Sequence, residues 1–176
     1  MSHPSLKDPG QDFVPLCRPS FDEIECVAVK ECLLSGWVTT GPKVATFQEK
    51  LSAFLGGRYV LALGSNTAGM YLALKALGIG PGDEVITTPM TFTATANVIE
   101  VVGATPVFCD VDNTFNINPE EIEKLITKKT FGIIPVHLNG LPACMHKIKK
   151  LGKKYNLKII EDAAQSILTT YNSKFT

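Results

Sequence analysis

From residue 58 to residue 160, short runs of β-branched and apolar residues alternate with longer segments of helical periodicity. Continuously apolar runs are typical of strands in a parallel sheet that is covered on both faces. The alternation therefore predicts an α/β fold: a doubly wound, mostly parallel sheet with helices on both faces. The predicted strands are Arg58–Leu63, Glu84–Thr88, Thr105–Asp110, Phe131–Val136 and Leu157–Ile160. The predicted helices between them are Thr67–Leu77, Phe92–Val102, Pro119–Ile126 and Met145–Tyr155.

The sequence before this alternation predicts two further helices. Residues 1–20 are rich in proline and predict an irregular N-terminal arm. A helix is expected over Phe21–Leu34, with a capping-box pattern at Ser20–Glu23. A second helix is expected over Lys43–Leu55, where Gly56 and Gly57 stop it. We therefore expect an arm over residues 1–20 and one partial domain over residues 21–176.

The charges of the chain balance, with 17 Lys and Arg residues against 17 Asp and Glu residues. This balance removes the electrostatic argument for binding nucleic acid or an acidic membrane. No apolar run approaches the roughly 20 residues needed to span a bilayer, and Met1–Gly10 does not resemble a secretory signal. The five cysteines and three histidines have neither CxxC nor metal-ligand spacing, which predicts reduced thiols and no zinc site. We expect a cytoplasmic protein.

A glycine-, serine- and threonine-rich segment, Gly64–Gly69, lies between a predicted strand and a predicted helix. Its small residues let the backbone approach a ligand, and the free amide groups at a helix start favour a phosphate. The side chains of Ser65, Asn66 and Thr67 can add hydrogen bonds. The same residue types are also the usual N-caps, so the segment alone is compatible equally with phosphate binding and with helix capping.

Phe92 follows the predicted strand Glu84–Thr88 and is expected near the edge of the sheet where that strand ends. An aromatic ring at this edge could stack on a planar cofactor. Taken alone, the residue fits a place in the core or a helix staple better.

Asp162 follows the last predicted strand, at the sheet edge where open α/β sheets bind their ligands. A carboxylate there can pair with a pyridine nitrogen and keep it protonated, so that the ring acts as an electron sink. Gln165, three residues on, could hydrogen-bond a ring substituent. A helix cap or surface ion pair is the alternative for Asp162, and the buried strand before it favours the cofactor interpretation. His137 also follows a predicted strand, and a structural role fits it at least as well.

Two other features carry less weight. The glycines of Gly78–Asp83 follow a helix rather than a strand, which is typical of a helix stop and turn. Five lysines between residues 147 and 154 are best interpreted as a solvated helix face, given the neutral total charge.

Several segments together resemble the sugar aminotransferases of the DegT/DnrJ/EryC1/StrS family, over about residues 14–174. They occur in one order: Gly36–Pro42, Gly64–Ala68, Gly80–Ile86, Thr91–Ala94, Gly103–Val107, Pro135–His137 and Ile160–Gln165. The resemblance implies the incomplete large domain of a fold-type-I pyridoxal phosphate enzyme that acts on nucleotide-linked keto sugars, with glutamate as the expected amino donor. It also implies a homodimer with active sites at the subunit interface.

The resemblance assigns roles to residues of this chain. The segment Ser65–Thr67 matches residues that hold the cofactor phosphate. Phe92 matches the aromatic residue that stacks on the ring. Asp162 matches the partner of the pyridine nitrogen, and Gln165 matches a residue that contacts the ring hydroxyl.

Two departures from the family pattern affect these expectations. Family members carry a Schiff-base lysine about twenty residues beyond the position of Thr176, and Lys174 matches an ordinary surface position instead. The resemblance therefore implies no catalytic residue within these 176 residues, and we expect the chain to be inactive alone, with the C-terminal domain absent. Ile167 and Leu168 replace a stretch that is usually His-Gly, which predicts an altered geometry after Gln165.

Three alternatives remain open from the sequence. Some relatives carry His in place of the lysine and act as sugar dehydratases, and the Asp162 segment is common to both activities. A truncated, non-catalytic protein that binds a cofactor or a partner is the second alternative. A Rossmann oxidoreductase is a poor third, because no predicted strand leads into G-x-G-x-x-G.

Overall fold

The computed structural model describes residues 19–176. The expected N-terminal arm therefore lies almost entirely outside the described residues. The described residues divide into two compact units, residues 19–51 and residues 52–176. The helices at the N-terminal side are α1 (Glu23–Leu34) and α2 (Pro42–Phe54), close to the two predicted helices. Gly56 and Gly57, which end α2 as predicted, both have positive φ angles of 74° and 84°.

Helix α1 begins with a capping box that lies two residues later than the sequence pattern predicts. Asp22, rather than Ser20, is the N-cap, and its carboxylate accepts a hydrogen bond from the Ile24 N–H at 2.8 Å. The Glu25 side chain closes the box by accepting from the Asp22 N–H at 2.8 Å. The prediction at Ser20–Glu23 was wrong, because Asp22 with Glu25 supplies two carboxylates at the helix start, where the dipole stabilises them.

The second unit contains a four-stranded parallel sheet with the strand order β2-β1-β3-β4. Its strands are β1 (Glu84–Thr87), β2 (Thr105–Phe108), β3 (Thr130–Ile133) and β4 (Lys158–Ile159). Each neighbouring pair is parallel, and Ile86, for example, is in register with Val107 on one side and Ile133 on the other. The strands agree with four of the five sequence predictions and confirm the α/β class.

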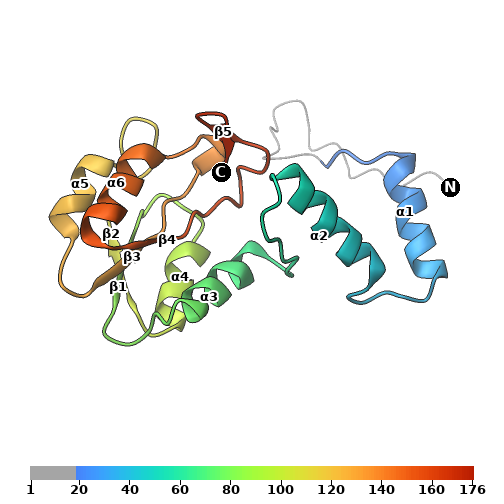
Figure 1. Cartoon of the computed structure of the whole chain (residues 1–176), viewed down its shortest axis with the longest axis horizontal. Helices are drawn as coiled ribbons and strands as arrows, with labels where there is room; N and C mark the ends of the chain where they lie inside the picture. Colours follow the sequence, from blue (N-terminus) through green and yellow to red (C-terminus); the bar gives the residue numbers. More distant parts are fainter. Residues whose placement is uncertain (1–18) are drawn as a thin grey trace, which may run out of the picture. The chain divides into compact units, whose positions relative to one another are not determined.

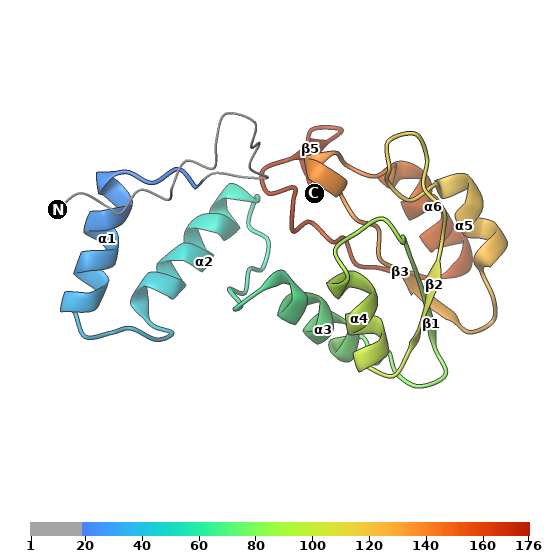
Figure 2. The ribbon, with the colours of Figure 1, turned by 180° about the vertical axis from the view of Figure 1, so that it is seen from behind.

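Four helices cover the two faces of this sheet (Figure 1). They are α3 (Asn66–Ala76), α4 (Ala94–Val101), α5 (Pro119–Leu125) and α6 (Met145–Tyr155). Val85 packs in one buried cluster with residues of α3 and α4, and Ile86 packs in a second cluster with residues of α5 and α6. Consecutive side chains of a strand point to opposite faces, so α3 and α4 cover one face and α5 and α6 the other. The view from behind shows the same two layers (Figure 2).

The strand predicted over Arg58–Leu63 is absent from the structure. These residues belong to no helix or strand, no strand of the described chain pairs with them, and the side chains of Tyr59 and Leu61 are exposed. The β-branched and aromatic composition that favours a strand cannot by itself provide a neighbour with which to form hydrogen bonds. The prediction of a five-stranded sheet was therefore wrong by one strand.

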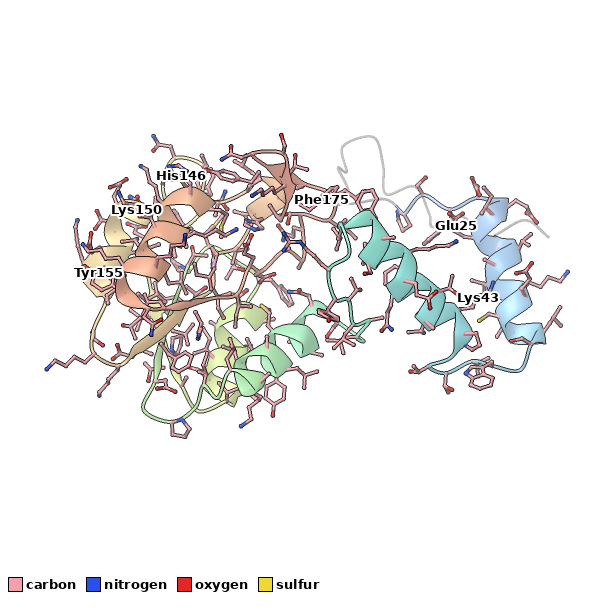
Figure 3. All side chains as sticks on the ribbon, viewed as in Figure 1. Glu25, Lys43, His146, Lys150, Tyr155 and Phe175 are labelled. Atoms are coloured by element: carbon pink, nitrogen blue, oxygen red, sulfur yellow. The ribbon has the colours of Figure 1, made fainter. Side chains whose placement is uncertain are left out.

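Helix α6 carries the lysine-rich stretch, and the lysines are exposed, as a solvated face requires. Figure 3 labels His146, Lys150 and Tyr155 along this helix. Two of the lysines also form ion pairs with α5, because Lys147 contacts Glu120 at 2.5 Å and Lys154 contacts Glu123. The chain then forms a short antiparallel hairpin, β5 (Thr170–Tyr171) and β6 (Lys174–Phe175), which the sequence did not predict.

Candidate functional site

Asp162 lies where the sequence predicts it, directly beyond β4 at the carboxyl-terminal edge of the sheet. It forms a parallel bridge with Val136, which follows β3. Its backbone N–H donates to the Pro135 carbonyl at 2.9 Å, and its own carbonyl accepts from the His137 N–H at 3.1 Å. The residue is only 5% exposed. The backbone therefore holds Asp162 rigidly between two chain segments.

The carboxylate of Asp162 is held by three hydrogen-bond donors. Oδ1 accepts from Nδ2 of Asn66 at 2.8 Å and from the Ala164 N–H at 3.2 Å. Oδ2 accepts from the hydroxyl of Thr95 at 2.8 Å. A buried carboxylate must be paired or hydrogen-bonded to remain charged. Residues from the start of α3 and from α4 thus converge on one carboxylate after β4.

Two of these donors differ from the sequence expectations. Asn66, which the sequence assigns to a phosphate, directs its side-chain amide to Asp162 instead. Thr95 was not predicted as a site residue at all. The available signal was its place shortly after the predicted strand Glu84–Thr88, at the sheet edge where Asp162 was also expected.

The start of α3 supports both interpretations of the Gly64–Gly69 segment. Ser65 is the N-cap, and its hydroxyl oxygen accepts from the Ala68 N–H at 3.1 Å. The capping alternative is therefore correct for Ser65. Within the described residues, the backbone N–H groups of Asn66 and Thr67 meet no acceptor. Two donors at the positive end of the helix dipole thus remain available to an anion.

Phe92 lies between the end of β1 and the start of α4, which begins two residues later than predicted. Its side chain is 73% exposed, so the expectation of a core position was wrong. The Phe92 carbonyl lies 3.2 Å from the hydroxyl of Thr95. This contact places the aromatic segment directly beside the Asp162 carboxylate.

Gln165 and His137 are attached to the same edge through other contacts. The Gln165 Oε1 accepts from the backbone N–H of Asn139, in the 3₁₀ turn η1 (Leu138–Gly140), at 2.7 Å. The His137 ring is fully buried and bonds to Ala143 and Glu161 rather than to the Asp162 carboxylate. The structural role that the sequence allowed for His137 is the one that this geometry supports.

The segment after Gln165 forms a tight turn. The Thr169 N–H donates to the Ser166 carbonyl at 2.9 Å, and Leu168 has a φ angle of 67°. This left-handed conformation is unusual for a leucine and ordinary for a glycine, the residue that the family resemblance leads us to expect there. Leu168 therefore occupies a strained position in this turn.

Residues 19–176 contain neither a candidate metal site nor a candidate membrane span. No group of three or more His, Cys, Asp or Glu residues in this range could hold a metal ion. No helix in the same range is long and apolar enough to cross a membrane. Cys26, Cys32, Cys109 and Cys144 carry free thiols.

Comparison with known proteins gives one consistent result. The family model described as the DegT/DnrJ/EryC1/StrS aminotransferase family matches residues 19–176. The spore coat polysaccharide biosynthesis protein SpsC of Bacillus subtilis (strain 168) is 45% identical over 163 residues. That match covers 92% of this chain and 42% of SpsC, so the chain spans about two fifths of the length of this relative.

Two solved structures agree with this assignment. The aminotransferase from Psychrobacter cryohalolentis is 44% identical, with a TM-score of 0.86 over 90% of this chain and 41% of the other. NtdA from Bacillus subtilis, solved with its bound cofactor PMP, is 40% identical, with a TM-score of 0.83 over 89% of this chain and 37% of the other. Matches of this identity and extent leave one assignment: the chain belongs to the DegT/DnrJ/EryC1/StrS aminotransferase family.

Proposed function

We propose that this chain forms the cofactor-binding part of a pyridoxal phosphate-dependent aminotransferase that acts on a nucleotide-linked keto sugar. The observation that carries the proposal is the Asp162 carboxylate, which is buried at the carboxyl-terminal edge of the sheet and held by Asn66 and Thr95. NtdA, a relative over most of this chain, was solved with PMP, the amino form of that cofactor.

The hydrogen bonds of Asp162 fit the ring nitrogen of this cofactor. A carboxylate offers about four lone-pair sites. Oδ1 accepts two hydrogen bonds from described residues, whereas Oδ2 accepts one, from Thr95. Oδ2 therefore retains a lone pair for a protonated pyridine nitrogen. When bound, the cofactor supplies an electron sink in that protonated ring.

The remaining site residues fit the other parts of the cofactor. The free N–H groups of Asn66 and Thr67 and the Thr67 hydroxyl would hold the phosphate at the start of α3. The exposed ring of Phe92 would cover one face of the pyridine. Gln165 would reach the ring hydroxyl with its side-chain amide group, while its oxygen stays on Asn139.

The substrate and the assembly are proposed from the family resemblance, and one relative supports a sugar substrate. SpsC takes part in spore coat polysaccharide biosynthesis by name, which supports a sugar as the substrate. We therefore propose transfer of an amino group, with glutamate as donor, to a keto sugar nucleotide in a cytoplasmic homodimer. The described lysines do not contact Asp162, and Lys174 lies exposed in the hairpin strand β6. We accordingly propose that the 176-residue chain has no transaminase activity by itself.

Titration of the purified chain with pyridoxamine phosphate tests the cofactor proposal. The wild-type chain should bind the probe, measured by the change in its fluorescence, and Asp162→Asn should weaken binding at least about tenfold, because the neutral amide cannot pair with a protonated ring. Glu120→Gln is the matched control, since this exposed carboxylate lies on α5 and pairs with Lys147 of α6. Equal affinity of the wild-type chain and the Asp162→Asn variant would refute the cofactor role of Asp162.

Activity of the chain is tested separately. Incubation with pyridoxal phosphate, glutamate and a keto sugar nucleotide should give no amino sugar. Turnover by the 176-residue chain would overturn the proposed inactivity without affecting the cofactor site.

A further inference from the structure

Thr95 occupies a central place in the polar network of the site. It lies in the first turn of α4, is 1% exposed, and has three oxygen atoms within hydrogen-bond distance of its hydroxyl. They are Oδ2 of Asp162 at 2.8 Å, the Thr91 hydroxyl at 2.9 Å and the Phe92 carbonyl at 3.2 Å. A hydroxyl has only one hydrogen to donate, so these three contacts cannot all be donated by Thr95.

The charges and distances assign the direction of each bond. A carboxylate is a stronger acceptor than a neutral oxygen, and it is also the nearest of the three. Thr95 therefore donates to Asp162, and the Thr91 hydroxyl donates to Thr95. The result is a chain of two hydroxyl groups that ends on the carboxylate, and bonds in such a chain strengthen one another.

The two oxygens of Asp162 depend on Thr95 to different degrees. Oδ1 is fixed by Asn66 and by the Ala164 N–H, whereas Oδ2 has Thr95 as its one donor within the described residues. Loss of the Thr95 hydroxyl would leave Oδ2 buried without a donor and the plane of the carboxylate free to turn about Oδ1. Oδ2 is the oxygen that retains a lone pair for a ring nitrogen.

We propose that Thr95 is a positioning residue, whose hydroxyl fixes the plane of the Asp162 carboxylate so that Oδ2 meets the cofactor ring nitrogen, with Thr91 reinforcing it. The cofactor part of this inference rests on the proposed function. The same turn carries the exposed ring of Phe92. One short segment, residues 91–95, would therefore set both the aromatic cover and the charged partner of the ring.

Three variants of this segment test the inference. Thr95→Val replaces the hydroxyl with a methyl group of similar size, and Thr95→Ser keeps the hydroxyl. Thr93→Val is the matched control, because Thr93 is exposed and makes no side-chain cap bond. Pyridoxamine phosphate labelled with ¹⁵N in the ring serves as the probe.

The proposal makes different predictions for each variant. Thr95→Val should lower probe affinity about tenfold and move the ring ¹⁵N resonance of the bound probe toward that of the neutral pyridine. Thr95→Ser and Thr93→Val should retain the affinity and the resonance of the wild-type chain. Thr91→Val, which removes the supporting donor, should move both readouts in the same direction by a smaller amount.

A measurement without cofactor separates this inference from the proposed function. The ¹³C resonance of the Asp162 carboxyl group in the free chain should shift in Thr95→Val and Thr91→Val, and it should stay in place in Thr95→Ser and Thr93→Val. Failure of the wild-type chain to bind the probe would reject the proposed function. The carboxyl resonance would still test whether Thr95 donates a hydrogen bond to Asp162. An unchanged carboxyl resonance in a folded Thr95→Val variant would overturn the positioning role.

Discussion

The buried ring of His137 donates a hydrogen bond from Nε2 to Oε2 of Glu161 across 3.1 Å. The direction follows from the other ring nitrogen, because Nδ1 accepts the Ala143 N–H at 3.1 Å and so carries no proton. The ring is therefore a neutral imidazole of defined tautomer. The second oxygen of Glu161 pairs with Lys149 at 3.0 Å. Glu161, the residue next to Asp162, is thus attached both to the loop after β3 and to α6.

These contacts predict a pH-dependent stability. The hydrogen bond from His137, and less strongly the contacts of Lys149, hold the pKa of Glu161 below its ordinary value of 4.5, although partial burial opposes them. A depressed pKa in the folded state contributes stability that is present above about pH 4.5 and is lost as the pH falls through the folded pKa. Glu161→Gln should therefore lower Tm at about pH 7, and its difference from the wild-type chain should shrink below about pH 4.5.

Thermal unfolding of the two chains over this pH range measures the difference. Lys149→Gln keeps the hydrogen bond from His137 and should show a weaker form of the same convergence. Wild-type and Glu161→Gln curves that remain parallel down to about pH 3 would contradict the assignment.

The second prediction concerns Asn66, which donates to the buried carboxylate from the start of α3. Asn66→Ala removes this donor and should lower the free energy of unfolding by about 1–3 kcal/mol. Asn97→Ala is the control, because Asn97 is exposed on α4 and its side chain forms no hydrogen bond within the described residues. Urea denaturation measures both, and the control should change by less than about 0.5 kcal/mol. Equal losses would show that the Asn66 contact does not stabilise the fold.

Only part of the Asp162 site could be predicted from the sequence. The position of Asp162 beyond the last strand followed from local pattern alone, because a strand brings its carboxyl end to one predictable edge of a parallel sheet. Its partners did not follow, because Asn66 and Thr95 are 96 and 67 residues away in the chain. Which hydroxyl or amide meets the carboxylate depends on how α3 and α4 pack, which no local pattern specifies.

The strand predicted over Arg58–Leu63 does not form, for a related reason. Its composition favours a strand, but a strand also needs a neighbour, and no strand of the described chain pairs with this segment. The hairpin β5–β6 is the opposite case, since its turn residues Asn172 and Ser173 both have positive φ angles, of 50° and 59°. Asparagine tolerates this conformation and serine adopts it less readily, so the sequence signal for the turn was weak.

The third prediction concerns Leu168, the third residue of the turn Ser166–Thr169. Such a position with φ of 67° favours glycine, and the Leu168 side chain is 62% exposed, so it loses little burial on removal. Leu168→Gly should raise the free energy of unfolding by about 0.5–1 kcal/mol, because relief of the left-handed strain exceeds the entropy cost of glycine. Urea denaturation and amide exchange at Thr169, whose N–H closes the turn, measure the effect.

Ile167→Gly is the matched control for this turn. Ile167 is also exposed, at 75%, but its φ is not positive. The glycine there should destabilise by about 0.5–1 kcal/mol. Destabilisation by Leu168→Gly of the same size would show that the turn is not strained.

The last prediction concerns the thiol of Cys109, at the end of β2. The thiol is fully buried and donates to the Asn118 carbonyl at 3.5 Å. Burial, and secondarily the charges of Glu121 and Asp110, raise its pKa from 9.0 to about 11. Only the thiolate reacts with alkylating reagents. At about pH 8, Cys109 should therefore resist alkylation for two reasons: its thiol is neutral, and it has no contact with water. Cys26, which is exposed, provides the internal comparison. Pulsed alkylation followed by mass spectrometry should modify Cys26 in the native chain, and it should modify Cys109 only at the urea concentrations that unfold the second unit. Modification of both thiols at equal rates in native buffer would contradict the buried position of Cys109.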